Sequence, residues 1–378
     1  FLIHGLDYDD THTAGVIHAT ASCFPTALGM AAEEGASGYD LLTAYVAGME
    51  VATRLGAVAK GGFHQVGFHP TGLIGAFGCA LVAGKLRGMT SKQLAYAQGI
   101  VLSMASGSLE FLQDGAWTKR MHPGWAGVAG ITAATLARNG FIGPNAVYEG
   151  RFGLFPSHLG AYFDPANLAL ATEGLEDVWE VEKVAVKPLP ACHFTHACAD
   201  SAVALRAAHD SRPDQIAGVR ALIPEEVVKT VCEPVQHKQK PQNSYDAQFS
   251  IPYAVACGLV HGRFGLAELE PDALADPTTL AVAHKVHYEG DPNSAFPKYY
   301  SGEVIVTLTD GREVRHREHM NRGASDRPLS SADIIGKFEE NASMALAAPH
   351  VERIKQAVLG LDDGISAREL SRLLSGRV

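Results

Sequence analysis

The sequence predicts a mainly α protein: a large all-helical domain plus a smaller α+β lid domain. Residues from about 20 to 140 are rich in Ala, Gly, Leu and Val, spaced as in amphipathic helices. From about residue 176 the pattern becomes alternating and valine-rich, which is typical of strands. Helical signals return after Ser330. We therefore expect a helical domain over 1–178 and 329–378, with the α+β lid domain over 179–328.

Capping and turn residues place the helices of the first part. Gly38-Tyr39-Asp40 begins one helix, whose apolar stripe includes Leu41, Tyr45 and Met49. Proline at the first helical position, a threonine or serine cap, and an Asn-Gly stop mark three more. These three are expected over about 70–87, 90–104 and 123–139, the last one opened by Pro123.

The second part alternates strands and helices. Strands are expected over about 178–186 and 216–223, and helices over about 195–209 and 247–262. Val304–Leu308 and Glu313–Arg315 flank Asp310-Gly311, which predicts a hairpin with a two-residue turn. Ser330-Ser331-Ala332-Asp333 is a capping pattern that opens a last helical stretch.

Composition excludes several functional classes. The chain has 378 residues, 47% of them hydrophobic and 19% charged, which supports a large core and argues against disorder. Its net charge of -10, without basic runs, argues against nucleic acid and anionic membranes as partners. No membrane-spanning run or signal peptide is recognised.

The cysteines indicate the redox environment. Cys23, Cys79, Cys192, Cys198, Cys232 and Cys257 form no CxxC pair, so we expect reduced thiols in a cytoplasmic protein. They form no pattern typical of an iron–sulfur or structural zinc site. Phe1 lies inside what looks like an ongoing element, so we expect a missing N-terminal portion.

The first eighteen residues carry the densest polar cluster. Asp7, Asp9, Asp10, Thr11 and His18 lie in an otherwise apolar segment. Buried carboxylates need partners, because their desolvation costs several kcal/mol or more, as an order of magnitude. The cluster is therefore either a solvated turn or a site, and we favour a site.

Two histidine-proline pairs are expected at helix starts, His69-Pro70 and His122-Pro123. A helix N-terminus offers unsatisfied N–H groups and partial positive charge, which suits an anion. Lys119 and Arg120 precede the second pair. Together these residues predict a pocket for a carboxylate or a phosphate.

A third group follows the first expected strand. Lys187 ends the strand, a rigid Pro-Leu-Pro turn follows, and Cys192-His193 leads into a helix. This is the profile of a positioned binding lysine. Adjacent residues on an extended turn point apart, so a Cys192–His193 nucleophilic pair is not expected. Tyr253, at a helix start, could donate a phenolic proton, although a half-buried packing role fits it as well.

The polar cluster in the first eighteen residues is also compatible with a different class of enzyme. Asp7, Asp9 and Thr11 fit the Asp-x-Asp-x-Thr signature of haloacid-dehalogenase-type phosphatases, with the preceding apolar run as their first strand. That class needs an alternating α/β body, which the helical stretch after the motif does not predict. No arrangement of carboxylates and histidines has convincing metal-ligand spacing.

Six segments in order resemble the MmgE/PrpD family, over nearly the whole chain. These are His4–His12, Gly67–Gly72, Thr118–Gly124, Lys187–His196, Phe249–Tyr253 and Arg327–Ser330. The family contains 2-methylcitrate dehydratase, cis-aconitate decarboxylase and iminodisuccinate epimerase. The resemblance implies a homodimer that has a large helical domain and an α+β lid, needs no metal or other cofactor, and carries about eighty further N-terminal residues.

Carried over position by position, the resemblance implies a set of active-site residues. The implied residues are Asp7, Thr11, His18, His69, Lys119, Lys187 and Tyr253, and we add His122, Cys192 and His193 as substrate-binding candidates. The family's decarboxylase has a histidine at the position of Cys192. The spacing from Thr11 to His18 is one residue longer than in that enzyme, and Ala19-Thr20 replaces a Pro-Ser pair.

The shared chemistry is proton transfer at a carbon next to a carboxylate. We expect Lys119 and Lys187 to hold substrate carboxylates, and His18 or His69 to move the proton, with Asp7 orienting a histidine. The first expectation is dehydration of a 2-methylcitrate-like acid. Epimerisation of an iminodisuccinate-like acid, decarboxylation of a cis-aconitate-like acid, and a non-catalytic homologue remain alternatives.

Overall fold

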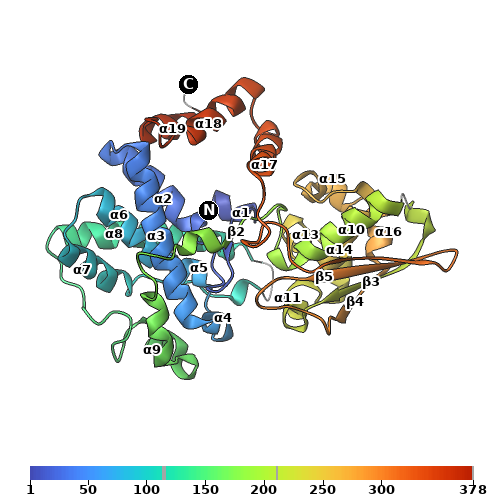
Figure 1. The fold of residues 1–378 in the computed structure, drawn as a ribbon, viewed down its shortest axis with the longest axis horizontal. Coiled ribbons are helices and arrows are strands. Elements are labelled where there is room, and N and C mark those ends of the chain that lie inside the picture. The colour runs from blue at the N-terminus through green and yellow to red at the C-terminus, as the bar shows by residue number, and fades with distance from the viewer. Residues whose placement is uncertain (113–115, 210–211, 377–378) are drawn as a thin grey trace. The chain divides into compact units, whose positions relative to one another are not determined.

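The computed structural model describes residues 1–112, 116–209 and 212–376, and it divides into two compact units. The helical unit comprises Phe1–Gly5, Asp9–Val184 and Ser331–Val378, and the α+β unit comprises Leu6–Tyr8 and Ala185–Ser330. The predicted fold class, mainly helical with a smaller sheet-containing part, is confirmed (Figure 1).

The helical unit is built around α6, which packs against α2, α3, α7 and α8. Its core is made of small and aliphatic side chains together with Phe63, Phe77 and Phe155. The unit's helices are α1 (Leu2–Gly5), α2 (Thr20–Glu34), α3 (Gly38–Ala59), α4 (Gly62–Gln65), α5 (Pro70–Leu73), α6 (Gly75–Leu86), α7 (Ser91–Val101), α8 (Thr118–Arg138), α9 (Leu154–Leu159), α17 (Ser331–Ser343), α18 (Ala348–Leu359) and α19 (Ala367–Leu374).

Two predicted helix starts are confirmed by their caps. The Ser37 side chain accepts from the Asp40 N–H, and the Thr90 side chain accepts from the Gln93 N–H, each within a capping box. Such reciprocal bonds satisfy donors that the first helical turn leaves unpaired.

Two other boundaries were predicted wrongly. The stretch expected as one helix from Pro70 is divided into α5 and α6 at Ile74. Helix α8 begins at Thr118, so Pro123 lies inside it and not at its start. Proline is tolerated best in the first turn because N–H groups there lack intrahelical partners, and that preference suggested the later start.

The α+β unit contains a four-stranded sheet in the order β4-β3-β5-β6 among the described residues. β3 runs parallel to β4 and antiparallel to β5, and β5 pairs antiparallel with β6. The sheet strands are β3 (Ile216–Ile223), β4 (Val286–Gly290), β5 (Gly302–Leu308) and β6 (Glu313–Glu318).

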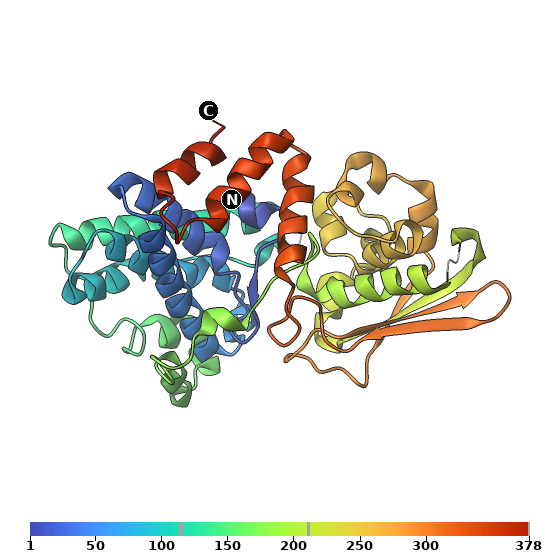
Figure 2. The same ribbon diagram turned by 45° about the horizontal axis from the view of Figure 1, so that its top comes forward.

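Helices α10 (His196–His209) and α14 (Ile251–His261) pack on each other and contact this sheet, α10 at β5 and β6 and α14 at β4 (Figures 1 and 2). The apolar core between them and the strands includes Leu205, Val255 and Val306. The shorter helices of the unit are α11 (Val228–Val231), α12 (Val235–Gln239), α13 (Ser244–Gln248), α15 (Pro271–Leu274) and α16 (Pro277–Ala283).

The strand predicted over 178–186 is wrong for most of its length. Residues Glu180–Lys183 form a 3₁₀ turn, and only the two-residue strand β2 (Val184–Ala185) follows. Side chains of α3 take the backbone groups that a strand would pair: Glu50 accepts from the Val181 N–H at 2.9 Å, and Arg54 donates to the Val178 carbonyl at 2.6 Å. Tertiary hydrogen bonds therefore override the alternating pattern.

Two smaller predictions also need correction. The hairpin turn has three residues, since Leu308 N–H donates to Arg312 O at 2.8 Å, and Gly311 takes the left-handed conformation with φ 86°. The helix expected over 247–262 is divided into α13 and α14, because Ser250 caps the second by accepting from the Tyr253 N–H.

Helix α3 is the one helix in the described ranges that is long and apolar enough to cross a membrane by length and composition. Of its most apolar window, 61% is buried inside the protein. Glu50 and Arg54 are an ion pair on this helix at 2.9 Å. It packs as a core helix.

We predict that Gly130→Ala destabilises the helical unit, because a Cβ there would stand 2.5 Å from the Cys79 Cβ at the α6–α8 contact. The free energy of unfolding from urea titration should fall by about 1–3 kcal/mol. The matched control is Gly29→Ala in α2, where no atom lies within 4 Å. There we expect a gain of about 0.5–1 kcal/mol. Equal effects at the two positions would contradict this account of the packing.

Candidate active site

The imidazoles of His4, His18, His69 and His122 lie together in the helical unit, and we name them the histidine cluster. Ring centroids are 5.1 Å apart for His4–His18, 5.4 Å for His4–His69 and 5.1 Å for His69–His122. His4, His69 and His122 are buried, whereas His18 is partly exposed. Three of these histidines were predicted as site residues, and His4 was missed.

Close packing brings His69 and His122 together. His69 is the N-cap residue of α5, and its N–H donates to the Gly107 carbonyl at 2.8 Å. Gly72 faces His122, and a Cβ at Gly72 would stand 2.8 Å from the His122 Cβ. The two Nδ1 atoms are 2.9 Å apart, so one ring donates its proton to the other.

Of the two expected helix starts, His69-Pro70 is confirmed at the beginning of α5, whereas His122-Pro123 is not a helix start. His122 lies in the second turn of α8, and α5 has only four residues after His69. A helix that short carries little of the partial charge that favours an anion. The contribution of these histidines to the site comes from their imidazole rings and not from the N–H groups of helix ends.

Burial keeps the cluster's inner rings neutral. Burial, followed by the charges of His4 and Lys119, lowers the pKa of His69 well below its usual value. The same causes in the same order lower the pKa of His122 to about 4. Lys119, itself buried near the start of α8, therefore supplies positive charge next to neutral imidazoles.

His18 is held in one tautomer. Its Nδ1 lies 2.6 Å from the Asp10 backbone carbonyl, which can only accept, so Nδ1 carries the proton. The Thr11 hydroxyl lies 3.3 Å from the same nitrogen, and the His18 N–H donates to Thr71 Oγ1 at 3.1 Å. In the neutral ring Nε2 is then the basic nitrogen.

The loop before His18 is strained. Val16 has φ 50°, a conformation that a β-branched residue rarely adopts. His12 and Ile17 close this loop through backbone hydrogen bonds of 2.9 and 3.3 Å. The His12 ring contacts Glu180 at 2.9 Å, which gives it a structural role. The packing of the unit therefore fixes the position of His18.

Asp9 and His4 are a pair that the sequence analysis did not assign. His4 Nδ1 lies 2.5 Å from Asp9 Oδ2, and both side chains are fully buried. The spacing of five residues within one motif was the available signal, but only the turn between them shows that they meet.

Asp10 has a carboxyl group suited to carry a proton. Oδ1 accepts from the Thr20 N–H at 3.2 Å, and Oδ2 is buried without a hydrogen-bond partner among the described residues. Burial, with the Asp9 carboxylate second, raises the pKa of Asp10 to about 7. Asp10 thus fixes the His18 tautomer through its backbone carbonyl. Its side chain can be neutral or charged near pH 7, because its pKa is about 7.

In the α+β unit, Lys187 is paired with Asp7. The fully buried ammonium donates to the Asp7 carboxylate and, at 3.2 Å, to the Asp7 carbonyl. Asp7 has φ 52°, a left-handed conformation that aspartate tolerates better than most residues. The predicted substrate-binding lysine therefore has an internal carboxylate partner.

The remaining candidates of this unit lie near the start of α10. His193 Nε2 accepts from the Asn321 side chain at 2.8 Å, and its ring lies 4.7 Å from that of His196. Burial, followed by the Lys187 charge, lowers the pKa of His196 to about 3. Cys192 is half-buried, and its N–H donates to the Gln248 carbonyl at 2.8 Å.

Tyr253 lies in the core of the α+β unit. Its hydroxyl donates to the Glu268 carbonyl at 2.7 Å, its side chain is fully buried, and burial raises its pKa. This is the packing role that the sequence analysis weighed against a catalytic one.

The phosphatase interpretation is wrong. The residues before Asp7 form the helix α1 and not the first strand that this class requires. The stretch after the motif consists of helices. Within the described ranges no group of three or more His, Cys, Asp or Glu is placed to hold a metal ion.

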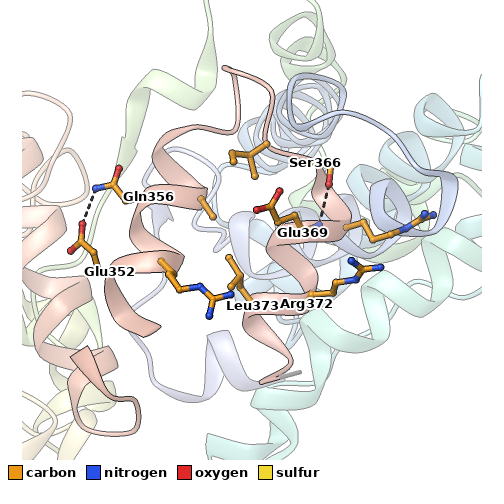
Figure 3. A pocket seen from close by; sticks show the side chains of 10 residues that line it. Glu352, Gln356, Ser366, Glu369, Arg372 and Leu373 are labelled. Atoms are coloured by element: carbon orange, nitrogen blue, oxygen red, sulfur yellow. Dashed lines mark hydrogen bonds between the residues drawn. The ribbon is translucent and has the colours of Figure 1, made fainter. Parts of the chain in front are cut away.

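One cavity in the described part of the chain lies away from these residues. About 600 Å³ of space opens between α18 and α19, as Figure 3 shows. Its lining is mixed in charge and includes Glu352, Arg353, Glu369 and Arg372. A second cavity of about 410 Å³, lined by Glu50, Arg54, Tyr148 and Phe155 among others, is mostly apolar. The buried, titratable groups that chemistry needs are in the histidine cluster, so we place the candidate site there.

Comparison with known proteins identifies a family over most of the chain. Residues 1–165 match the MmgE/PrpD N-terminal domain, and residues 189–363 match the MmgE/PrpD C-terminal domain.

Several relatives are named as cis-aconitate decarboxylases or as similar to one. A cis-aconitate decarboxylase of Homo sapiens is 30% identical, covering 99% of this chain and 77% of the relative. A cis-aconitate decarboxylase-like protein of Aspergillus oryzae is 26% identical, covering 100% and 81%. A cis-aconitate decarboxylase of Aspergillus terreus is 24% identical, covering 99% and 79%.

We predict that Asp10 makes stability depend on pH. In the unfolded chain the Asp10 proton leaves near pH 3.8, and in the folded protein it leaves near pH 7. Between these values only the folded state holds this proton, so the contribution of Asp10 to stability falls by up to about 1.4 kcal/mol per pH unit as pH rises. Asp10→Asn should therefore gain stability relative to the wild type between pH 4 and 8 in urea titrations. A difference independent of pH would contradict the buried, protonated carboxyl.

We predict that Lys187 and Asp7 are coupled energetically. Lys187→Met leaves a buried carboxylate without its cation and should lower the free energy of unfolding by about 3–5 kcal/mol. The double variant Asp7→Asn/Lys187→Met removes both charges and should recover more than half of that loss. Additive effects in this double-mutant cycle would show that the pair does not stabilise the unit.

Proposed function

Because the chain belongs to the MmgE/PrpD family, we propose that it is a lyase that acts on a di- or tricarboxylate. The reaction is proton transfer at the carbon next to a carboxylate. The observation that carries the proposal is the histidine cluster, in which buried neutral imidazoles lie beside the cation of Lys119.

The cluster has the parts that this chemistry requires. Removing a proton next to a carboxylate creates an enolate-like dianion, which positive charge in a buried site stabilises. Lys119 supplies that charge. His18, partly exposed and with its Nδ1 occupied, offers Nε2 as the general base. The Thr11 hydroxyl beside Nδ1 helps to hold the ring.

His69 and His122 serve as a second proton-handling pair. Through their Nδ1–Nδ1 contact of 2.9 Å, a ring that takes a proton on Nε2 can pass its Nδ1 proton to the other ring, so that the pair relays one proton. Both rings are neutral near pH 7, so neither competes with Lys119 for a carboxylate. A lyase needs such a group to protonate the product carbon or a leaving hydroxyl.

Two reactions are proposed for this site. In decarboxylation a C–C bond breaks, CO₂ leaves and the resulting carbanion takes a proton; in dehydration a proton leaves carbon and the neighbouring hydroxyl group leaves as water. The names of the relatives support decarboxylation of a cis-aconitate-like acid. Dehydration of a 2-methylcitrate-like acid is supported by the sequence differences around His18 and at Cys192, where the residues depart from the decarboxylase pattern.

The substrate test compares both acids with one purified protein. Dehydration raises absorbance near 240 nm by forming a conjugated alkene. Decarboxylation releases CO₂ and leaves a product one carbon shorter in NMR spectra. Exchange of the α-proton with D₂O, without either change, would indicate an epimerase. No turnover and no exchange with any polycarboxylate would favour a non-catalytic homologue.

We predict that His69→Asn lowers kcat/KM by about 10²-fold or more on whichever acid is turned over, because a carboxamide can neither take nor give a proton near neutral pH. Asparagine keeps a polar group near Nδ1, so the contact with His122 can persist. The control is His287→Ala, at an exposed position of β4, which should leave kcat/KM unchanged. Near-wild-type turnover by a folded His69→Asn protein would remove the histidine cluster from the reaction.

Homodimer formation and a cytoplasmic location also stay proposals. An exposed apolar stripe supports association with a second copy; it consists of the α8 N-cap residue Trp117 and of Met121, Trp125 and Val128 on α8. Sedimentation of the purified protein measures this directly.

A further inference from the structure

Asp9 and His4 form a buried pair at the start of the helical unit. The 2.5 Å contact joins His4 Nδ1 to one carboxylate oxygen, and neither side chain is exposed. Burial of a single charge is costly, so a carboxylate in this place needs a cation. Since a carboxylate accepts only, the proton in this contact belongs to His4.

The His4 ring lies next to His18 and His69, the histidines to which the proposed function assigns proton transfer. It lies 5.1 Å from the His18 ring and 5.4 Å from the His69 ring, in a stacked arrangement with His69. The other titratable groups that face His69 are His18 from the loop before α2, and Lys119 and His122 from α8.

These neighbours determine the charge at His69. Among them Lys119 and His4 are the sources of positive charge, and the effect of His4 comes directly after burial in lowering the pKa of both His69 and His122. A unit charge about 5 Å away, at an effective dielectric constant of about 20, shifts a pKa by about two units. The state of His4 therefore matters to the whole cluster.

We propose that Asp9 is a positioning residue that holds His4 as an imidazolium, and that this fixed charge acts together with burial to lower the basicity of His69 and His122, so that both rings are neutral and able to accept protons near pH 7. Asp9 acts through His4 and does not touch the reacting carbon. The catalytic consequence rests on the proposed function, whereas the charge state of His4 does not.

The test is a titration of the histidine rings by NMR in protein carrying ¹³C-labelled histidine. In Asp9→Asn, His4 loses its counter-ion and its charge, so His69 and His122 should titrate about two units higher than in the wild type. His4→Gln removes the cation itself and should shift the same two rings upward. The matched control is Asp164→Asn, an exposed capping residue of the same unit, which should shift neither ring.

The catalytic arm uses the same variants. If the chain turns over a polycarboxylate, the acid limb of the kcat/KM profile should move upward by about the same amount in Asp9→Asn, and Asp9→Glu should restore it in part. A merely structural role would lower activity without moving this limb.

The two proposals can fail separately. Unchanged titrations of His69 and His122 in both Asp9→Asn and His4→Gln would overturn the positioning role, even in an active enzyme. So would a neutral His4 at pH 7 in the wild type. Shifted titrations in a protein that turns over no polycarboxylate would support the positioning role and overturn the proposed function.

Discussion

The burial of imidazoles is the constraint on which the candidate site depends. An exposed histidine is about one-quarter protonated near pH 7, as follows from its usual pKa of about 6.5. Here burial lowers the pKa of His122 to about 4 and that of His69 well below its usual value. The rings are therefore neutral bases beside the cation of Lys119. If they were exposed to water, part of them would be protonated at this pH. The packing of the helical unit creates this chemistry.

Small residues make that burial possible. Gly130 lets α8 approach α6, and Gly72 lets His122 approach His69, since a Cβ at either position would collide with its neighbour. The close contacts between helices therefore require small residues such as Ala and Gly. These contacts in turn bring the histidine side chains together. The strained loop at Val16 adds a local cost where His18 is positioned, as is common at functional sites.

The carboxylates of the opening segment have separate physical roles. Asp7 pairs with Lys187 in the α+β unit, and Asp9 pairs with His4 in the helical unit. Asp10 uses its backbone carbonyl to fix the His18 tautomer, and burial raises the pKa of its side chain to about 7. The three acids of one motif thus have three roles: Asp7 pairs with a lysine, Asp9 pairs with His4, and Asp10 fixes the tautomer of His18. Asp7 was the acid expected to orient a histidine, but the histidine cluster is contacted by the next two acids, Asp9 and Asp10.

The sequence by itself determined the fold class, because apolar periodicity, capping boxes and turn residues act locally. Ser37 and Thr90 cap helices where their patterns place them, and β3 covers the predicted Ile216–Ile223. Local signals failed where distant side chains took part: Glu50 and Arg54 turned an apparent strand at 180–183 into a 3₁₀ turn. The sequence also marked His18, His69, His122 and Lys119. Only the tertiary structure decided that His4 joins them and that Lys187 is already paired, because burial and contact between residues far apart in the chain set both the partner and the charge of a titratable group.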